Sequence, residues 1–461
     1  MVFSSLTFLF FYLPIVCLIY KLTPLHYRNF VLFISSLIFY GWGEPIYILL
    51  MLLSTVVDYI NGFFVHQYRH NQTLAKRFVY FSIFFNLSLL SFFKYYDWII
   101  GMLNLPFLKP LGLPLPLGIS FYSFQTMTYP IDIYRQEATC QKNLFSFGAY
   151  VCMFPQLVAG PIVRYKEIDE QLKHPDNRIE TFYNGICIFT IGLAKKVLIA
   201  NSAGALYQEL LSIPFNNLST ILVWIMHISF TLQIYFDFCG YSEMAMGLGN
   251  MLGFHFPKNF NYPYISKSIK EFWGRWHITL GQFFKDYVYI PLGGSRCGTK
   301  RTIINLFIVW FLTGLWHGAD WNFVIWGLYF WFLLMIEKYI IKSYIPKIPH
   351  FIQHLTTLIL IIIGFTIFDT TNLTLLKNHL LAMFGFTNIA FINPLTLFYL
   401  RNYFVLLIIW IIGCTPIPKQ VVDHFPKLKN NSQPVFYILL LILCICSIAS
   451  EAYQPFLYFR F

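Results

Sequence analysis

The chain has 461 residues, of which 57% are hydrophobic and only 11% are charged. Soluble domains are about half apolar and about a quarter charged, so this composition excludes an ordinary soluble enzyme and indicates a polytopic membrane protein. The net charge of +12 does not call for a nucleic-acid partner, because Lys and Arg accumulate in the short cytoplasmic loops of membrane proteins.

Apolar runs follow one another along the whole sequence. The candidate spans are 3–21, 29–42, 45–65, 78–94, 98–108, 114–133, 143–160, 181–200, 218–253, 302–316, 321–341, 351–368, 403–414 and 435–450. We expect about ten to thirteen of them to be membrane-embedded helices, since each crossing needs about 20 apolar residues. Helices satisfy their own backbone in lipid, so the prediction is an all-α fold, with residues 1–461 forming a single transmembrane domain. The first run lacks a basic n-region and is interpreted as a retained span.

The first loops predict the orientation of the chain. The connection 21–28 carries two basic residues and 66–77 carries three, whereas the connection between them, 42–45, carries only an acid. Positive loops stay in the cytoplasm. The sequence therefore predicts a multi-pass protein of the cell (cytoplasmic) membrane with its N-terminus outside.

The segment 258–301 is strongly basic. Its charged residues are eight basic and two acidic, which gives a net charge of +6: Lys258, Lys267, Lys270, Glu271, Arg275, Lys285, Asp286, Arg296, Lys300 and Arg301. Its apolar residues recur at spacings of three and four, as in an amphipathic helix in the membrane interface: Ile269, Trp273, Trp276, Leu280, Phe283 and Tyr287. Such a helix holds anionic lipid heads, and in a second interpretation it also binds a polyanionic acyl donor, either coenzyme A or an acidic carrier protein. Arg275 and Lys285 are the candidate donor ligands, although Arg275 and Asp286 also suit structural ion pairs.

The run 311–330, FLTGLWHGADWNFVIWGLYF, carries one ionisable ring, His317. Such a group is costly at membrane depth, so it is either a neutral imidazole bonded to a neighbouring helix or a functional residue. Gly314 and Gly318 thin the helix where a substrate could approach. Asp320 either shares the face of His317 or caps the next helix.

Three tryptophans of the same run, Trp316, Trp321 and Trp326, could wall a pocket around His317. Trp316, next to the histidine, is a further candidate for donor binding. A neutral imidazole can take a proton from an alcohol that attacks a thioester, which is general-base acyl transfer and needs no metal. His277 is a second candidate, with a satisfied histidine on the apolar helix face as the alternative.

The stretch 233–254 combines buried polar residues with glycines: Gln233, Asp237, Ser242, Glu243, Gly240, Gly247, Gly249 and Gly253. Polar groups of this kind hold transmembrane helices together, and glycines let them approach closely. Asp237 is the exception, because an acid at depth needs a partner that the sequence does not identify.

Six stretches together carry a family resemblance: GLWHGADWNFVIWGLY, EFWGRWHITLGQFFKDYVYIPLGG, QIYFDFCGYSEMAMGLG, PLGISFYSFQTMTYPIDIYR, FPQLVAGPIVRY and the opening VFSSLTFLFFYLP with FYGWGEP. They resemble the membrane-bound O-acyltransferase (MBOAT) family, and within it the bacterial subunits for O-acetylation of alginate and peptidoglycan. The resemblance implies about a dozen helices around a central funnel, with His317 as the catalytic histidine and His277 as the second characteristic histidine.

The resemblance also implies acetyl-CoA as the cytoplasmic donor, a polysaccharide acceptor outside and an extracytoplasmic acyltransferase partner protein. Two positions depart from the family pattern. Phe368–Asp369 stands where Phe-Arg is usual, which puts a local ion pair in doubt, and Cys239 stands where serine is usual.

Two alternatives stay open. One is the D-alanyl transfer subunit of teichoic acid modification, which takes its acyl group from a carrier protein; the IPLGG run and the long C-terminal third favour the acetyl subgroup instead. The other is a transporter or flippase whose buried histidine relays protons. The sequence has no internal repeat or matched pair of broken helices, which disfavours a transporter.

Overall fold

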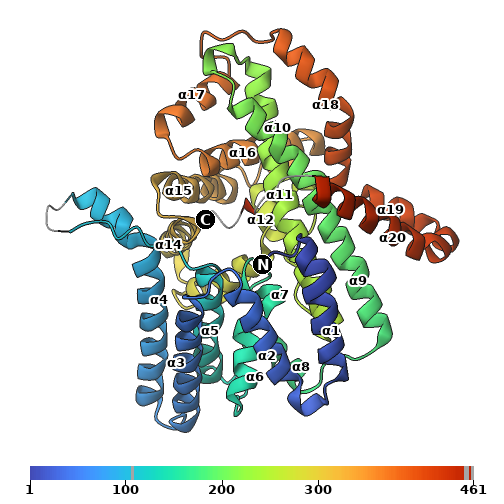
Figure 1. Cartoon of the computed structure of the whole chain (residues 1–461). Coiled ribbons are helices and arrows are strands. Elements are labelled where there is room, and N and C mark those ends of the chain that lie inside the picture. The colour runs from blue at the N-terminus through green and yellow to red at the C-terminus, as the bar shows by residue number, and fades with distance from the viewer. Residues whose placement is uncertain (105–107, 451–455, 458–461) are drawn as a thin grey trace. The chain divides into compact units, whose positions relative to one another are not determined.

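The computed structural model describes residues 1–104, 108–450 and 456–457, and every regular element in this part of the chain is a helix (Figure 1). This confirms the predicted all-α fold. The helices form two compact units, and the single transmembrane domain stays a prediction. Two continuous helical stretches, 179–211 and 220–251, contribute residues to both units.

Of the described residues, unit 1 holds 1–193, 240–258 and 448–450. Its helices are α1 (Leu13–Leu22), α2 (Leu25–Gly41), α3 (Ile48–Gln67), α4 (Gln72–Leu103), α5 (Ile119–Tyr134), α6 (Leu144–Cys152), α7 (Phe154–Leu157), α8 (Tyr165–Lys173), α9 (Ile179–Ala194), whose last residue is in unit 2, and the end of α11 (Thr220–Met251). The predicted spans 78–94 and 98–108 are wrong as separate elements, because α4 runs through both up to Leu103. No proline or polar run interrupts this stretch before Asn104, which adopts the left-handed conformation that ends the helix.

Glycines hold α9 and α11 together in unit 1. A Cβ on Gly185 would lie 2.7 Å from the carbonyl oxygen of Gly247, and a Cβ on Gly192 would lie 2.6 Å from that of Gly240. The two backbones are therefore in direct contact, and only glycine fits at these positions. This confirms the predicted role of Gly240 and Gly247 in close helix approach.

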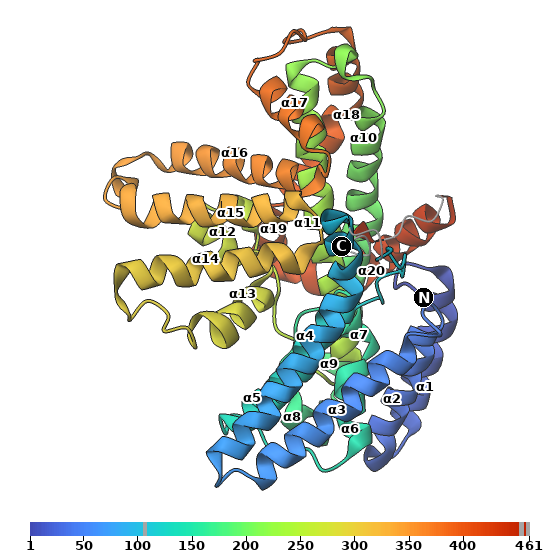
Figure 2. The ribbon, with the colours of Figure 1, turned by 90° about the vertical axis from the view of Figure 1, so that its left-hand side faces the viewer.

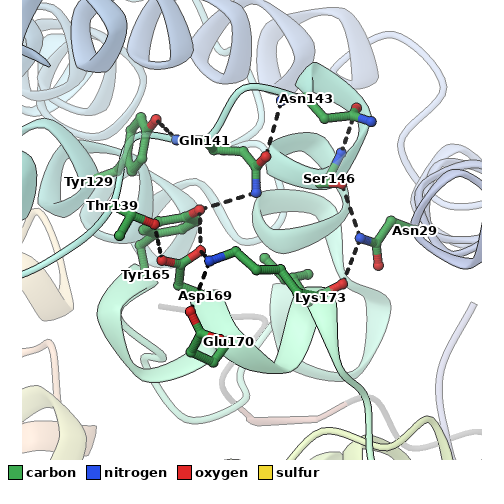
Figure 3. Close-up of polar contacts among 11 residues, drawn as sticks. Asn29, Tyr129, Thr139, Gln141, Asn143, Ser146, Tyr165, Asp169, Glu170 and Lys173 are labelled. Atoms are coloured by element: carbon green, nitrogen blue, oxygen red, sulfur yellow. Dashed lines mark hydrogen bonds and ion pairs between the residues drawn. The ribbon is translucent and has the colours of Figure 1, made fainter. Parts of the chain in front are cut away.

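Two connections of unit 1 that carry basic residues lie at the same end of the unit. The turns between α1 and α2 and between α3 and α4 are both at the lower end in Figure 1. The amphipathic helix α8 is fixed at this end by hydrogen bonds (Figure 3): Asn29 donates to the carbonyl of Leu172 at 2.9 Å, and the Tyr165 hydroxyl donates to the buried Asp169 at 2.9 Å. Gln141 donates to the Tyr165 hydroxyl at 3.2 Å.

Unit 2 holds residues 194–239, 259–447 and 456–457 of the described chain. Its helices are α10 (Asn201–Leu211), the first part of α11, α12 (Ile269–Arg275), α13 (Ile278–Phe284), α14 (Gly298–His317), α15 (Trp321–Met335), α16 (His350–Asp369), α17 (Leu373–Met383), α18 (Pro394–Gly413), α19 (Ile417–His424) and α20 (Pro426–Ser450). Figure 2 shows α14, α15 and α16 side by side.

Aromatic side chains form the core between these three helices and α12. The ring centroid of Trp273 on α12 lies 4.8 Å from that of Trp310 on α14 and 4.9 Å from that of Phe330 on α15. Trp276 lies 5.0 Å from Phe365 on α16. Edge-to-face contacts at these separations are favourable beyond the burial of area. They fix α12 against the helices that carry the candidate site.

Eight of the described helices are long and apolar enough to cross a membrane. They are Ile48–Gln67, Gln72–Leu103, Ile179–Leu211, Thr220–Met251, Trp321–Ile340, His350–Asp369, Pro394–Gly413 and Ser432–Ser450, and a shorter apolar helix covers Phe8–Leu22. A multi-pass membrane protein is therefore confirmed. Further apolar helices, such as α2 and α5, account for other predicted runs. The central funnel stays a prediction.

Candidate active site

His317 is the last residue of α14. The helix ends there because Gly318 is extended, with φ −169° and ψ 161°. The imidazole is only 4% exposed. Three aromatic rings surround it, with centroids 4.9 Å away for Trp316, 4.9 Å for Trp326 and 5.1 Å for Phe368. The ring thus sits in an apolar aromatic environment that excludes bulk water.

The two glycines next to His317 do not open the helix to a substrate. A Cβ on Gly314 would lie 2.5 Å from the carbonyl oxygen of Phe323, and a Cβ on Gly318 would clash with the Phe323 ring. Their space is filled by α15, so the predicted approach route is wrong and the glycines serve helix packing. Asp320 accepts the backbone N–H of Trp321 at 2.6 Å and is the N-cap of α15. Trp321 itself is 49% exposed.

His277 lies at a break in the basic segment. Here α12 ends and α13 begins, and His277 adopts a left-handed conformation with φ 44° and ψ 52°. The predicted continuous amphipathic helix is therefore wrong, although its spacing of three and four persists. Its apolar residues pack inside unit 2 and do not lie on a bilayer surface; Trp276 and Leu280 are 3% and 4% exposed. These apolar residues therefore pack against the aromatic core of unit 2, whereas the prediction placed them against lipid.

The two predicted histidines, His277 and His317, both contact the ring of Trp316. The ring of His277 lies 6.0 Å from that of Trp316, which in turn lies 4.9 Å from His317. His277 is 2% exposed and packs edge-on against Phe238 at 4.6 Å. Trp316, itself 5% exposed, therefore lies between two buried imidazoles.

Asn259, which the sequence gave no reason to select, contacts His277. Its Oδ1 lies 3.2 Å from Nδ1 of His277 and accepts the Thr279 hydroxyl at 2.9 Å. Its carbonyl oxygen accepts the backbone N–H of Ile278 at 2.9 Å. Asn259 is 1% exposed. It lies 18 positions from His277 in the sequence, so no periodicity or spacing connects the two residues.

The two predicted donor ligands with positive charge differ in their surroundings. Arg275 pairs with Glu271 at 2.9 Å and donates to the carbonyl of Asn261 at 3.0 Å, so it holds α12 in place. The predicted structural ion pair of Arg275 is therefore confirmed, with Glu271 as its partner. Lys285 begins the turn after α13 and is exposed.

Exposed basic residues collect at one end of the helices of unit 2. Glu337 at the end of α15 accepts the N–H of Ile269 at the start of α12, at 2.7 Å. The exposed basic residues of these adjoining segments are Lys267, Lys270, Lys285, Arg296, Lys300, Arg301, Lys338, Lys342 and Lys347; we call them the basic end. His317 is at the other end of α14, about 24 Å from Arg301 along the helix axis at 1.5 Å per residue.

Asp237 has the partner that its depth requires. Its Oδ1 lies 2.5 Å from Nζ of Lys196, and the two side chains are only 3% and 4% exposed. Its Oδ2 accepts the backbone N–H of Leu457 at 2.7 Å, and the Lys196 ammonium also lies 4.7 Å from the centre of the Phe456 ring. The signal in the sequence that could have identified the partner is the charge of Lys196 inside the predicted span 181–200. Asp369, where the sequence departs from the Phe-Arg of the family pattern, accepts the Tyr207 hydroxyl.

The buried histidines predict a loss of stability in acid. Burial lowers the pKa of His277 to about 3 and that of His379 on α17 to about 4. Unfolded histidine binds a proton below about pH 6.5, so between about pH 6.5 and pH 4 the unfolded state binds more protons and stability rises with pH. We expect Tm in detergent to fall on the order of 5 °C across this window. His379→Gln should make Tm depend less steeply on pH. His350→Gln, at an exposed histidine, should leave the pH dependence of Tm unchanged. If Tm depended on pH equally steeply in both variants, His379 would not be a source of the acid sensitivity.

Comparisons with known proteins agree on one family. The family model described as MBOAT, the membrane-bound O-acyltransferase family, matches residues 134–377. That range contains both histidines, Trp316 and Asn259. More than half of the chain is therefore covered, and the candidate site lies inside the match.

Individual relatives are similar over different lengths. The chain is 39% identical to the probable alginate O-acetylase AlgI of Pseudomonas aeruginosa over 394 residues, which is 84% of this chain and 75% of that protein. It is 32% identical to the peptidoglycan O-acetyltransferase of Helicobacter pylori over 428 residues, 85% of this chain and 81% of that protein. The teichoic acid D-alanyltransferase of Bacillus subtilis is 30% identical over 224 residues, only 46% of this chain and 56% of that protein.

Proposed function

Because the chain belongs to the membrane-bound O-acyltransferase family and is thus an acyltransferase, we propose that it passes acetyl from cytoplasmic acetyl-CoA to an extracytoplasmic polysaccharide. An alginate-like exopolysaccharide or peptidoglycan is the acceptor, reached with an extracytoplasmic acyltransferase partner protein. The observation that carries the proposal is the similarity to two proteins named for O-acetylation over more than four fifths of the chain, at 84% and 85%.

His317 is the proposed general base. A neutral imidazole accepts the proton of the attacking hydroxyl while the new C–O bond forms and the C–S bond of the thioester breaks. The thiolate of coenzyme A leaves and takes up a proton. The aromatic surroundings of His317, with Trp316, Trp326 and Phe368 within 5.1 Å, support this role because they exclude the water that would hydrolyse the thioester.

The distribution of charge supports entry of the donor from the cytoplasm. Basic residues stay on the cytoplasmic side of membrane proteins, so the basic end of unit 2 faces the cytoplasm in this proposal. The phosphates of coenzyme A bind there, with Lys285 as one ligand, and the thioester arm extends toward His317. In unit 1 the turns that follow α1 and α3 carry basic residues, whereas the connection 42–45 carries only an acid, which supports an N-terminus outside.

Transfer of D-alanine from a carrier protein is the alternative within the family. The relative with that name matches less than half of the chain, so it supports the alternative less than the O-acetylation relatives support acetyl transfer. No specific feature of the described residues favours a transporter.

The deciding experiment offers the donors separately to purified protein in nanodiscs. We expect radiolabelled acetyl-CoA to be turned over, with label passing to a soluble polysaccharide or to water. A D-alanyl carrier protein should give no turnover. Turnover of the carrier protein alone would replace the proposal by the D-alanyl alternative, and net movement of a solute without either donor would replace it by transport.

Charge reversal at Lys285 tests the donor surface. Lys285→Glu should raise KM for acetyl-CoA about three- to tenfold, corresponding to about 1 kcal/mol for an exposed charge, and leave kcat nearly unchanged. High salt should reduce the difference because it screens exposed charges. Lys419→Glu makes the same change on α19, outside the basic end, and should leave KM unchanged; an equal rise in both variants would argue against a local donor site.

A further inference from the structure

The amide of Asn259 has an orientation that the hydrogen bonds determine. The backbone N–H of Thr279 donates to Oδ1 of Asn259 at 3.2 Å. A backbone N–H can only donate, so the Asn259 atom that it meets is the amide oxygen and not the amide nitrogen. The same oxygen lies 3.2 Å from Nδ1 of His277. Since two acceptors do not form a hydrogen bond, Nδ1 of His277 carries the proton.

Asn259 also holds the backbone on which the ring sits. Its carbonyl oxygen accepts the N–H of Ile278, directly after His277, at 2.9 Å. The neighbouring Asn261 donates its backbone N–H to the carbonyl of Arg275 at 2.9 Å. These bonds stabilise the left-handed conformation of His277, which is unfavourable for a residue with a Cβ. One residue therefore fixes both the turn and the tautomer.

We propose that Asn259 is a positioning residue, which locks His277 as the Nδ1–H tautomer and so presents Nε2 as a proton acceptor in acyl transfer. This inference rests on the proposed function. A neutral imidazole has one donor and one acceptor nitrogen, and the partner of the first decides which is the second. Nε2 then accepts a hydrogen bond from the attacking hydroxyl.

An amide at position 259 has a different effect on the charge of His277 from that of a carboxylate. A carboxylate next to Nδ1–H would hold the ring in the same orientation but would favour the charged imidazolium. Burial alone lowers the pKa of His277 to about 3, and a neutral amide leaves that effect in place. The ring therefore stays neutral and able to accept a proton throughout the working range of pH.

Two variants of Asn259 and one control variant separate the role of Asn259 from a general effect of charge. In Asn259→Asp the hydrogen bonds persist and the carboxylate favours protonated His277, so the acidic limb of the kcat profile should move up by at least about one pH unit. Asn259→Ala should lower kcat about tenfold or more at all pH values and leave KM for acetyl-CoA unchanged. Asn402→Asp adds the same charge at an exposed position of α18 and should match the wild type.

A second readout does not depend on activity. In protein labelled with ¹⁵N-histidine, with the His277 signal assigned by its loss in His277→Gln, the wild type should show the Nδ1–H tautomer. An Nε2–H tautomer, or a pH profile of Asn259→Asp equal to that of the wild type, would overturn the inference. A wild type with the Nδ1–H tautomer but no acetyl transfer would instead refute the proposed function, so the two failures are distinguishable.

Discussion

Replacement of His317 by glutamine is expected to lower kcat for acetyl transfer by about 10²- to 10⁴-fold, the usual contribution of a general base. KM for the donor should change little, because the substitution removes a proton acceptor needed in the transition state and leaves the exposed basic end intact. Glutamine is preferable to alanine here. The ring is packed among Trp316, Trp326 and Phe368, and truncation would add a cavity to the loss of chemistry.

The control for this variant is His350→Gln, which makes the same replacement at an exposed position at the start of α16. It should keep wild-type kcat and KM. Both variants should elute as the wild type does in detergent and melt within a few degrees of it. If His317→Gln retained more than about a tenth of wild-type kcat, proton abstraction by His317 would be refuted.

Loss of one partner of the buried Lys196–Asp237 pair should produce the largest effect on stability. Lys196→Met removes the ammonium 2.5 Å from Asp237 and leaves the carboxylate with the N–H of Leu457, in surroundings where both side chains are 3–4% exposed. Breaking such a pair costs about 3–5 kcal/mol, because an uncompensated charge stays buried. The measurement is the free energy of unfolding in mild detergent with added denaturant.

A double-mutant cycle isolates the pair from the loss of packing. Lys196→Met combined with Asp237→Leu replaces both charges by apolar side chains, and such replacements are often neutral or stabilising. We expect the double variant to be more stable than either single variant. Lys195→Met, at the adjacent lysine, should cost less than Lys196→Met. Additive costs in the double variant would show that the two charges do not stabilise each other.

The helical fold could be predicted from the sequence because composition and hydropathy decide it. A long apolar run in lipid has few ways to satisfy its backbone, and helices result. His317 and His277 could be selected for a related reason: an ionisable ring inside an apolar run is costly and thus conspicuous. The contact of both rings with Trp316 was not predictable, because it depends on how α12 packs against α14.

The break at His277 could not be predicted from the periodicity of the apolar residues. The apolar spacing of three and four continues from Ile269 to Tyr287 across the break, and nothing in the residue type marks His277 for a left-handed conformation, which favours glycine or asparagine. The interruption is imposed by tertiary bonds from Asn259. The same holds for the glycines at 314 and 318, where sequence showed a missing side chain but not that Phe323 fills the space.

The buried Lys196–Asp237 pair has a consequence for how the protein enters the membrane during synthesis. A lone lysine or aspartate at the centre of a helix costs about 2.5–3.5 kcal/mol on insertion into the bilayer. Lys196 and Asp237 are in consecutive spans, 179–211 and 220–251, and neutralise each other at 2.5 Å. The two spans therefore leave the translocon most easily as a hairpin, with the earlier one retained until the later one has been made.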